Sequence, residues 1–219
     1  MAAAYTLILG NRNLSSWSLR PYLAMRATGA PFEEIIVRLD QPETRATIRE
    51  HSPAGKVPVL KIAEGGRTVT VWDSLAICET LAERHPEAKL WPDDASVRAV
   101  ARSFAAEMHS GFPDLREQLA MDFAREVPAP LLRDATRQQL VRILEAWSGA
   151  LEHYGRRGGF LFGRFSIADC MYAPVVSRLV TYGIDVPPAV DAYCGRMMDL
   201  PAMRDWGAAA KREIESGWK

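Results

Sequence analysis

The stretch NRNLSSWSLRPYLA, residues 11–24, follows the short apolar run YTLILG at residues 5–10. The apolar run predicts a strand, and apolar residues at helical spacing predict a helix over residues 18–28. Ser15 and Ser16 therefore stand where a strand gives way to a helix. This junction raises the question of what two adjacent serines do there.

A helix N-terminus presents unpaired N–H groups and a partial positive charge. A serine at this place is a plain helix cap in one interpretation and a hydroxyl directed at an anion in the other. Pro21 fits the first turn of the helix, where a missing N–H is tolerated.

The composition is that of an ordinary globular protein. The 219 residues are 48% hydrophobic and 25% charged, with a formal net charge of +0, which argues against a nucleic-acid partner. Cys78, Cys170 and Cys194 are odd in number and widely spaced, which argues against a disulfide framework and against a metal site. The start of the chain lacks the features of a signal peptide, and no stretch approaches the ~20 apolar residues of a membrane span. We expect a cytoplasmic protein with no membrane partner.

The first part of the chain alternates strand and helix signals. Strands are expected at residues 5–10, 33–40, 56–62 and 67–72, and helices at 18–28, weakly at 42–50, and at 73–85. This order predicts a small mixed sheet with helices packed on it.

After the segment LWPDD at residues 90–94, the pattern is helical almost throughout. One apolar stripe comprises Val97, Ala101, Phe104, Met108, Phe112 and Leu115. Further helices are expected at residues 165–180 and 187–200. The chain is therefore predicted to have an α/β N-terminal domain over residues 1–86, a linker over 87–95 and an all-α C-terminal domain over 96–219.

Three features of the N-terminal part converge on one ligand. The serine junction is the first. Pro58 opens a predicted strand, which leaves the main chain of Val57 free to pair with something else. Asp73 and Ser74 begin a helix, whose end suits a carboxylate, while Asp73 suits an amine. A short peptide with a carboxylate, an amine and a thiol matches this set, held at Val57 as an added strand.

These segments resemble the cytosolic glutathione transferases over essentially the whole chain. SSWSLRPYLA is similar to the SSCSWRVRIAL segment of the zeta-type, serine-using branch, KVPVL to the family's proline-containing strand, and WDSLAI to its acidic–serine turn. GRFSIADCMYAP and LPAMRDW resemble segments of the family's helical domain. The resemblance implies a thioredoxin-like domain, a helical bundle and a homodimer.

The resemblance also implies roles for particular residues. Glutathione is the expected co-substrate, and a small electrophile is the second substrate. Ser15 is the expected catalytic residue, donating a hydrogen bond to the thiolate. The expected glutathione-binding residues, including a cis peptide bond before Pro58, are Ser16, Trp17, Lys56, Val57, Pro58, Asp73 and Ser74. The expected electrophile pocket contains Met108, His109 and Phe112.

One position departs from the pattern, because Trp17 stands where the zeta segment has a cysteine. This departure argues against a mixed-disulfide mechanism, which needs a low-pKa thiolate there. It also weakens the alternative of a glutathione-dependent isomerase of the maleylacetoacetate type. A third alternative, a non-catalytic glutathione-binding or assembly module, has no need of the full ligand set.

Other residues are predicted to be structural. Ser166 and Asp169 have the spacing of a capping box and are expected to contact no ligand. Trp147 and Trp206 are expected in the core, as are Cys78 and Cys170, which fall on apolar helix faces.

Overall fold

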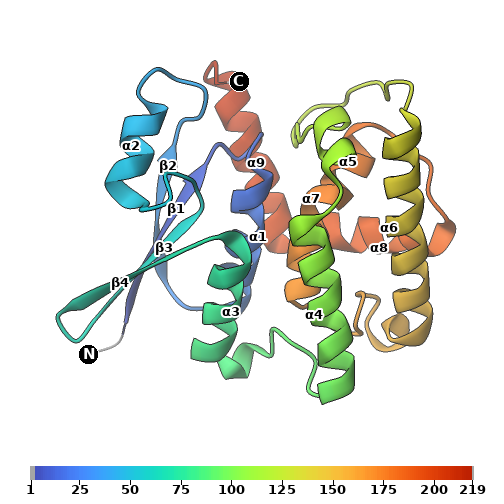
Figure 1. The fold of residues 1–219 in the computed structure, drawn as a ribbon, viewed down its shortest axis with the longest axis horizontal. Helices are drawn as coiled ribbons and strands as arrows, with labels where there is room; N and C mark the ends of the chain where they lie inside the picture. Colours follow the sequence, from blue (N-terminus) through green and yellow to red (C-terminus); the bar gives the residue numbers. More distant parts are fainter. Residues whose placement is uncertain (1–2, 219) are drawn as a thin grey trace.

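A four-stranded sheet organises the first part of the chain (Figure 1). The computed structural model describes residues 3–218, apart from the side chain of Arg157. The strands are β1 (Ala4–Gly10), β2 (Phe32–Val37), β3 (Val59–Glu64) and β4 (Arg67–Trp72), in the order β2-β1-β3-β4. β1 and β2 are parallel, whereas β3 is antiparallel to both β1 and β4. The sheet is therefore mixed, as predicted.

Helices cover both faces of this sheet because side chains alternate along β1. Leu7 and Leu9 lie in the main core with α1 (Ser16–Thr28) and α3 (Ser74–Arg84). Ile8 points the other way, into a small cluster with Ile48 of α2 (Thr44–His51). The fixed alternation thus puts α1 and α3 on one face and α2 on the other.

The rest of the described chain is helical. Its helices are α4 (Ala95–Ser110), α5 (Pro113–Gln118), α6 (Asp134–His153), α7 (Ile167–Thr181), α8 (Pro188–Met198) and α9 (Pro201–Glu215), and short 3-10 turns lie at Pro86–Ala88 and Gly155–Arg157. α7 is buried along almost its whole length and packs against α1, α4 and α8. The α/β part followed by an all-α part is confirmed.

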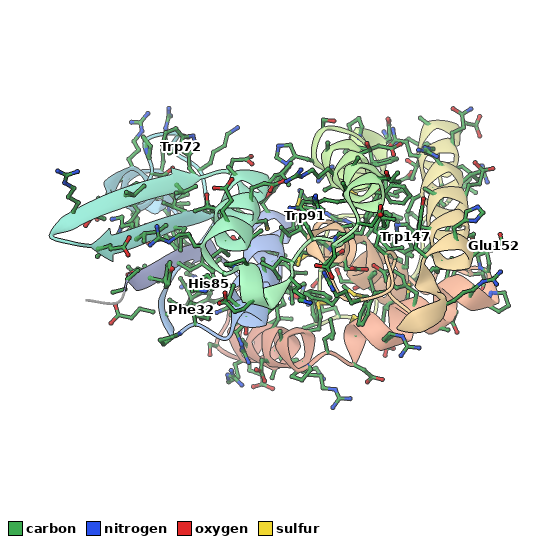
Figure 2. All side chains as sticks on the ribbon, turned by 90° about the horizontal axis from the view of Figure 1, so that it is seen from below. Phe32, Trp72, His85, Trp91, Trp147 and Glu152 are labelled. Atoms are coloured by element: carbon green, nitrogen blue, oxygen red, sulfur yellow. The ribbon has the colours of Figure 1, made fainter. Side chains whose placement is uncertain are left out.

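The predicted core residues are in place. Trp147, Trp206, Cys78 and Cys170 are buried, and so is Cys194, which is not among the predicted core residues. Figure 2 shows Trp147 among the helices, Trp91 between the two parts of the molecule and Trp72 at the margin of the sheet. Among the residues described, no helix combines the length and apolarity needed to cross a membrane.

Several predicted boundaries are wrong. β3 begins at Val59 and not at residue 56. α1 begins at Ser16, so Pro21 lies inside the helix and not in its first turn. β2 ends at Val37 and not at residue 40. The apolar stripe that runs to Leu115 is not one helix, because α4 ends at Ser110 and Phe112 takes a left-handed φ of 61° before α5 begins.

The predicted capping box starts α7. The buried carboxylate of Asp169 accepts hydrogen bonds from the N–H and hydroxyl of Ser166, both at 2.9 Å. It also accepts from the N–H of Leu161 and the hydroxyl of Tyr193, both at 3.1 Å. Burial raises the pKa of Asp169 to about 6, against the opposing effect of these donors. The carboxylate thus ties α7 and α8 to the loop before α7.

Candidate functional site

The hydroxyl of Ser15 is free of the capping role that its position suggests. Ser15 is the N-cap of α1, yet its side chain makes no cap hydrogen bond. The hydroxyl donates instead to Oγ of Ser18 at 2.8 Å, and that oxygen also accepts from the N–H of Gly10 at 2.9 Å. A hydroxyl hydrogen rotates to suit its partners. Ser15 can therefore turn its O–H toward an anion at the helix N-terminus.

A backbone edge opposite the serine is also unoccupied. The Val57–Pro58 peptide bond is cis, as the resemblance implies, and Pro58 directly precedes β3. Within residues 3–218, the N–H and C=O of Val57 have no hydrogen-bond partner. Backbone groups in this state are what an extended peptide needs in order to pair as an added strand.

Asp73 and Ser74 lie at the start of α3. Asp73 has a φ of 76°, and its Oδ1 accepts from the N–H groups of Leu75 and Ala76 at 2.9 and 3.2 Å. Its Oδ2 lies 3.3 Å from Nε2 of His109. Ser74 is 1% exposed, and its hydroxyl has no partner among the residues described. Asp73 is therefore a helix cap that keeps one oxygen for another group, beside a buried hydroxyl that lacks a partner.

These groups surround one cavity of about 680 Å³. It is lined by all eight residues expected to act in catalysis or to bind glutathione: Ser15, Ser16, Trp17, Lys56, Val57, Pro58, Asp73 and Ser74. Sequence reasoning missed six more: Leu14, Leu39, Ile48, Ala54, Gly55 and Trp72. Leu14, Trp72 and Gly55 are next to predicted site residues, which is the only signal that the sequence offers for them.

The three residues expected around an electrophile do not line this cavity. The ring of His109 meets Trp17 edge-on, with 5.3 Å between the centroids. Met108 is fully buried, and Phe112 is 7% exposed. Of the three, His109 alone is brought into ring contact with a cavity residue, and the role of all three stays a prediction.

Positive charge gathers behind Trp17. The guanidinium carbons of Arg20 and Arg116 lie 4.4 and 5.0 Å from the centre of its ring. Arg20 is fully buried, and none of its side-chain nitrogens has a partner among the described residues. Burial, together with the nearby charges of Arg116 and Arg178, lowers the pKa of Arg20 to about 9, so it stays charged at neutral pH. This charge favours an anion in the neighbouring cavity.

A larger cavity of about 910 Å³ lies elsewhere, between residues 123–128, the end of α7 and α9. None of the predicted site residues lines it. Across residues 3–218 we find no group of three or more His, Cys, Asp or Glu side chains arranged to hold a metal ion.

Two family models match the sequence. The model for the glutathione S-transferase N-terminal domain matches residues 14–84, and the model for the glutathione S-transferase C-terminal domain matches residues 130–206. A probable maleylacetoacetate isomerase of Caenorhabditis elegans is 28% identical over 194 residues, which is 87% of each chain. Glutathione S-transferase omega-1 of Mus musculus is 32% identical over 127 residues, covering 58% of this chain and 50% of its own.

Solved structures give the same picture. A glutathione transferase homologue from Burkholderia with bound glutathione superposes with a TM-score of 0.73 at 26% identity, covering 95% of this chain and 99% of its own. Maleylacetoacetate isomerase from Anaeromyxobacter dehalogenans with bound glutathione superposes with a TM-score of 0.71 at 27% identity, covering 95% of this chain and 97% of its own. The expected thioredoxin-like and helical fold is therefore confirmed.

Proposed function

Since this chain belongs to the glutathione S-transferase family, we propose that it binds glutathione in the 680 Å³ cavity and activates its thiol with Ser15 for attack on small electrophiles. The observation that carries the proposal is that polar groups lining this cavity are available to a ligand. The hydroxyl of Ser15 is not used to cap α1, and the hydroxyl of Ser74 and the backbone of Val57 have no partners within the described chain.

Each of these groups matches one part of the peptide. The γ-glutamyl carboxylate accepts from the hydroxyl of Ser74 at the positive end of α3. The ammonium group beside it pairs with Oδ2 of Asp73. The cysteinyl backbone pairs with Val57 as an added strand, which brings the sulfur toward Ser15.

The role of Ser15 is to stabilise the thiolate and not to remove its proton. A free thiol has a pKa of ~8.5 and is mostly protonated near neutral pH, yet the thiolate is the nucleophile. Lowering the thiol pKa by about 2 needs ~2.7 kcal/mol of differential stabilisation. A charge-assisted hydrogen bond of ~1.5–3 kcal/mol and a helix end of ~0.3–1 kcal/mol supply that amount. The charge on Arg20 acts in the same direction.

A pH titration of bound glutathione, followed by the ultraviolet absorbance of the thiolate, tests this proposal. We expect a lowered thiol pKa in the wild type and a return toward the ordinary value in Ser15→Ala. Ser16→Ala shows whether the second serine contributes, and Ser103→Ala, an exposed serine on α4, is the matched control. Unchanged thiol ionisation and turnover in Ser15→Ala would exclude this role.

The similarity to maleylacetoacetate isomerases favours a second candidate function. In an isomerase, the thiolate of glutathione adds to a conjugated double bond and leaves an enolate. Rotation then occurs about the bond that has become single, and collapse of the enolate reforms the double bond and expels the sulfur as the thiolate. Product analysis separates the two reactions. A transferase consumes glutathione and yields a stable conjugate, whereas an isomerase returns free glutathione with a rearranged substrate.

We further propose that the protein acts in the cytoplasm as a homodimer. The three cysteines are free thiols, which fits a reducing compartment. The homodimer is proposed from membership of the glutathione S-transferase family. Light scattering on the purified protein checks the dimer, and a mass of one chain would reject it.

A further inference from the structure

The loop over residues 11–14, which delivers Ser15 to the cavity, is held by the far end of the chain. The carboxylate of Glu213, on α9, accepts from the backbone N–H of Arg12 at 2.8 Å and from that of Asn13 at 3.1 Å. Trp206 is about two turns earlier on the same face of α9, and its indole N–H donates to the C=O of Arg12 at 2.6 Å. Glu213 is 9% exposed and Trp206 is fully buried.

A second segment of the helical part holds the same loop from another side. The N–H of Phe123 donates to the C=O of Asn13 at 3.0 Å, and the N–H of Ala124 donates to Oδ1 of Asn13 at 2.9 Å. The side-chain amide of Asn13 donates to Asp122 at 2.7 Å. The backbone of Arg12 and Asn13 is thus fixed by residues more than a hundred positions away.

The loop passes this constraint to the serine. The N–H of Ser15 donates to the C=O of Asn11 at 2.8 Å, and the C=O of Ser15 accepts from Ser18 and Leu19 at the start of α1. A catalytic group must be held within ~0.5 Å of its productive position. A displacement of residues 12 and 13 therefore moves the hydroxyl of Ser15 relative to the bound sulfur.

We propose that Glu213 is a positioning residue, whose carboxylate sets the place of the Ser15 hydroxyl and thereby the ionisation of the bound thiol. This inference rests on the proposed function. A carboxylate suits the task because its two oxygens accept two neighbouring N–H groups at once, in charge-assisted bonds. An amide at this position has one accepting oxygen and turns an NH₂ group toward the remaining N–H.

The experiment compares Glu213→Gln with Glu215→Gln, an exposed glutamate on the same helix. We expect Glu213→Gln to raise the pKa of the bound thiol by about 0.5, which lowers the thiolate fraction and kcat about threefold at a pH below that pKa. The KM for glutathione should stay within about twofold, because the groups that bind its backbone and carboxylate are not moved. Glu215→Gln should match the wild type.

Other outcomes overturn the inference. A wild-type thiol pKa in folded Glu213→Gln reduces Glu213 to a structural residue, even if the melting temperature falls. If Glu213→Gln does not fold, Glu213→Asp draws the carboxylate back from the two N–H groups of Arg12 and Asn13, and an unchanged thiol pKa in that variant has the same meaning. The inference fails alone if Ser15→Ala raises the thiol pKa and Glu213→Gln does not. The proposed function fails if the wild type shows no lowered thiol pKa.

Discussion

The buried carboxylate of Asp169 gives a quantitative test of how the helical part is held together. Replacement by Ala leaves four buried donors without their acceptor: the N–H groups of Leu161 and Ser166 and the hydroxyls of Ser166 and Tyr193. Each unsatisfied buried donor costs ~1–3 kcal/mol, so Asp169→Ala should lose roughly 5 kcal/mol, which is comparable to the whole stability of many domains. Asp169→Asn keeps the shape and should lose less.

The pH dependence of the stability that Asp169 contributes is a sharper test than the size of the loss in Asp169→Ala. Because burial raises the pKa of Asp169 to about 6 in the folded protein, the folded state binds a proton that the unfolded state releases near pH 4. The unfolded chain therefore binds fewer protons in this window, and the stability from Asp169 falls as the pH rises from about 4 to about 6. Between pH 5 and pH 7.5 the fall is about 1.4 kcal/mol.

Urea unfolding of the wild type, Asp169→Asn and the surface control Asp134→Asn at both pH values measures this effect. The stability difference between the wild type and Asp169→Asn should be larger at pH 5 than at pH 7.5, while the control shows no such change. A difference that is constant or grows with pH refutes the assigned pKa direction. A selective loss of glutathione affinity in folded Asp169→Asn refutes the purely structural role.

Three further predictions concern the rest of the molecule. A thiol reagent should label less than one cysteine per folded chain within minutes, and all three cysteines after unfolding. The three thiols are buried, and burial raises their pKa values, to about 12 for Cys194. Rapid labelling of the native protein would contradict this. Gly158→Ala should lower the melting temperature by several degrees, since an added Cβ would overlap with the C=O of Gly163. An unchanged melting curve would contradict this. Asp73→Asn should keep the cap of α3, and with it the melting temperature. It should weaken glutathione binding about tenfold, as measured by calorimetry, because the charge that pairs with the ammonium group is lost. An affinity equal to that of the wild type would remove Asp73 from the binding site.

The sequence predicts which residues line the 680 Å³ cavity better than it predicts some helix boundaries, for physical reasons. Ser15, Val57 and Asp73 lie at points where a local pattern shows a strand or helix beginning, so their neighbourhood marks them. Gly111 is a local signal in the sequence for the break after α4. In the structure a glycine is needed there, because a Cβ at this position would lie 2.8 Å from the C=O of Glu107. The apolar stripe continues through that break and conceals it.

What the sequence could not predict depends on contacts distant in the chain. Nothing in the neighbourhood of Glu213 distinguishes it from Glu215, and only the fold brings it to the loop before Ser15. The lining residues Leu39 and Ile48 belong to the same class, since their place in the cavity follows from how α2 and the end of β2 pack.

The contact between α9 and the serine loop has a consequence for biosynthesis. The ribosome synthesises β1, the loop over residues 11–14 and α1 early. The N–H of Arg12 cannot form its hydrogen bond to Glu213 until that residue, 201 positions later, has been made. At ~5–20 residues per second this interval is on the order of 10–40 s. The sheet can form during that time, whereas the loop that delivers Ser15 lacks its last support. In a nascent chain, the loop before Ser15 therefore gains its support from α9 only after residues 206–213 have left the ribosome.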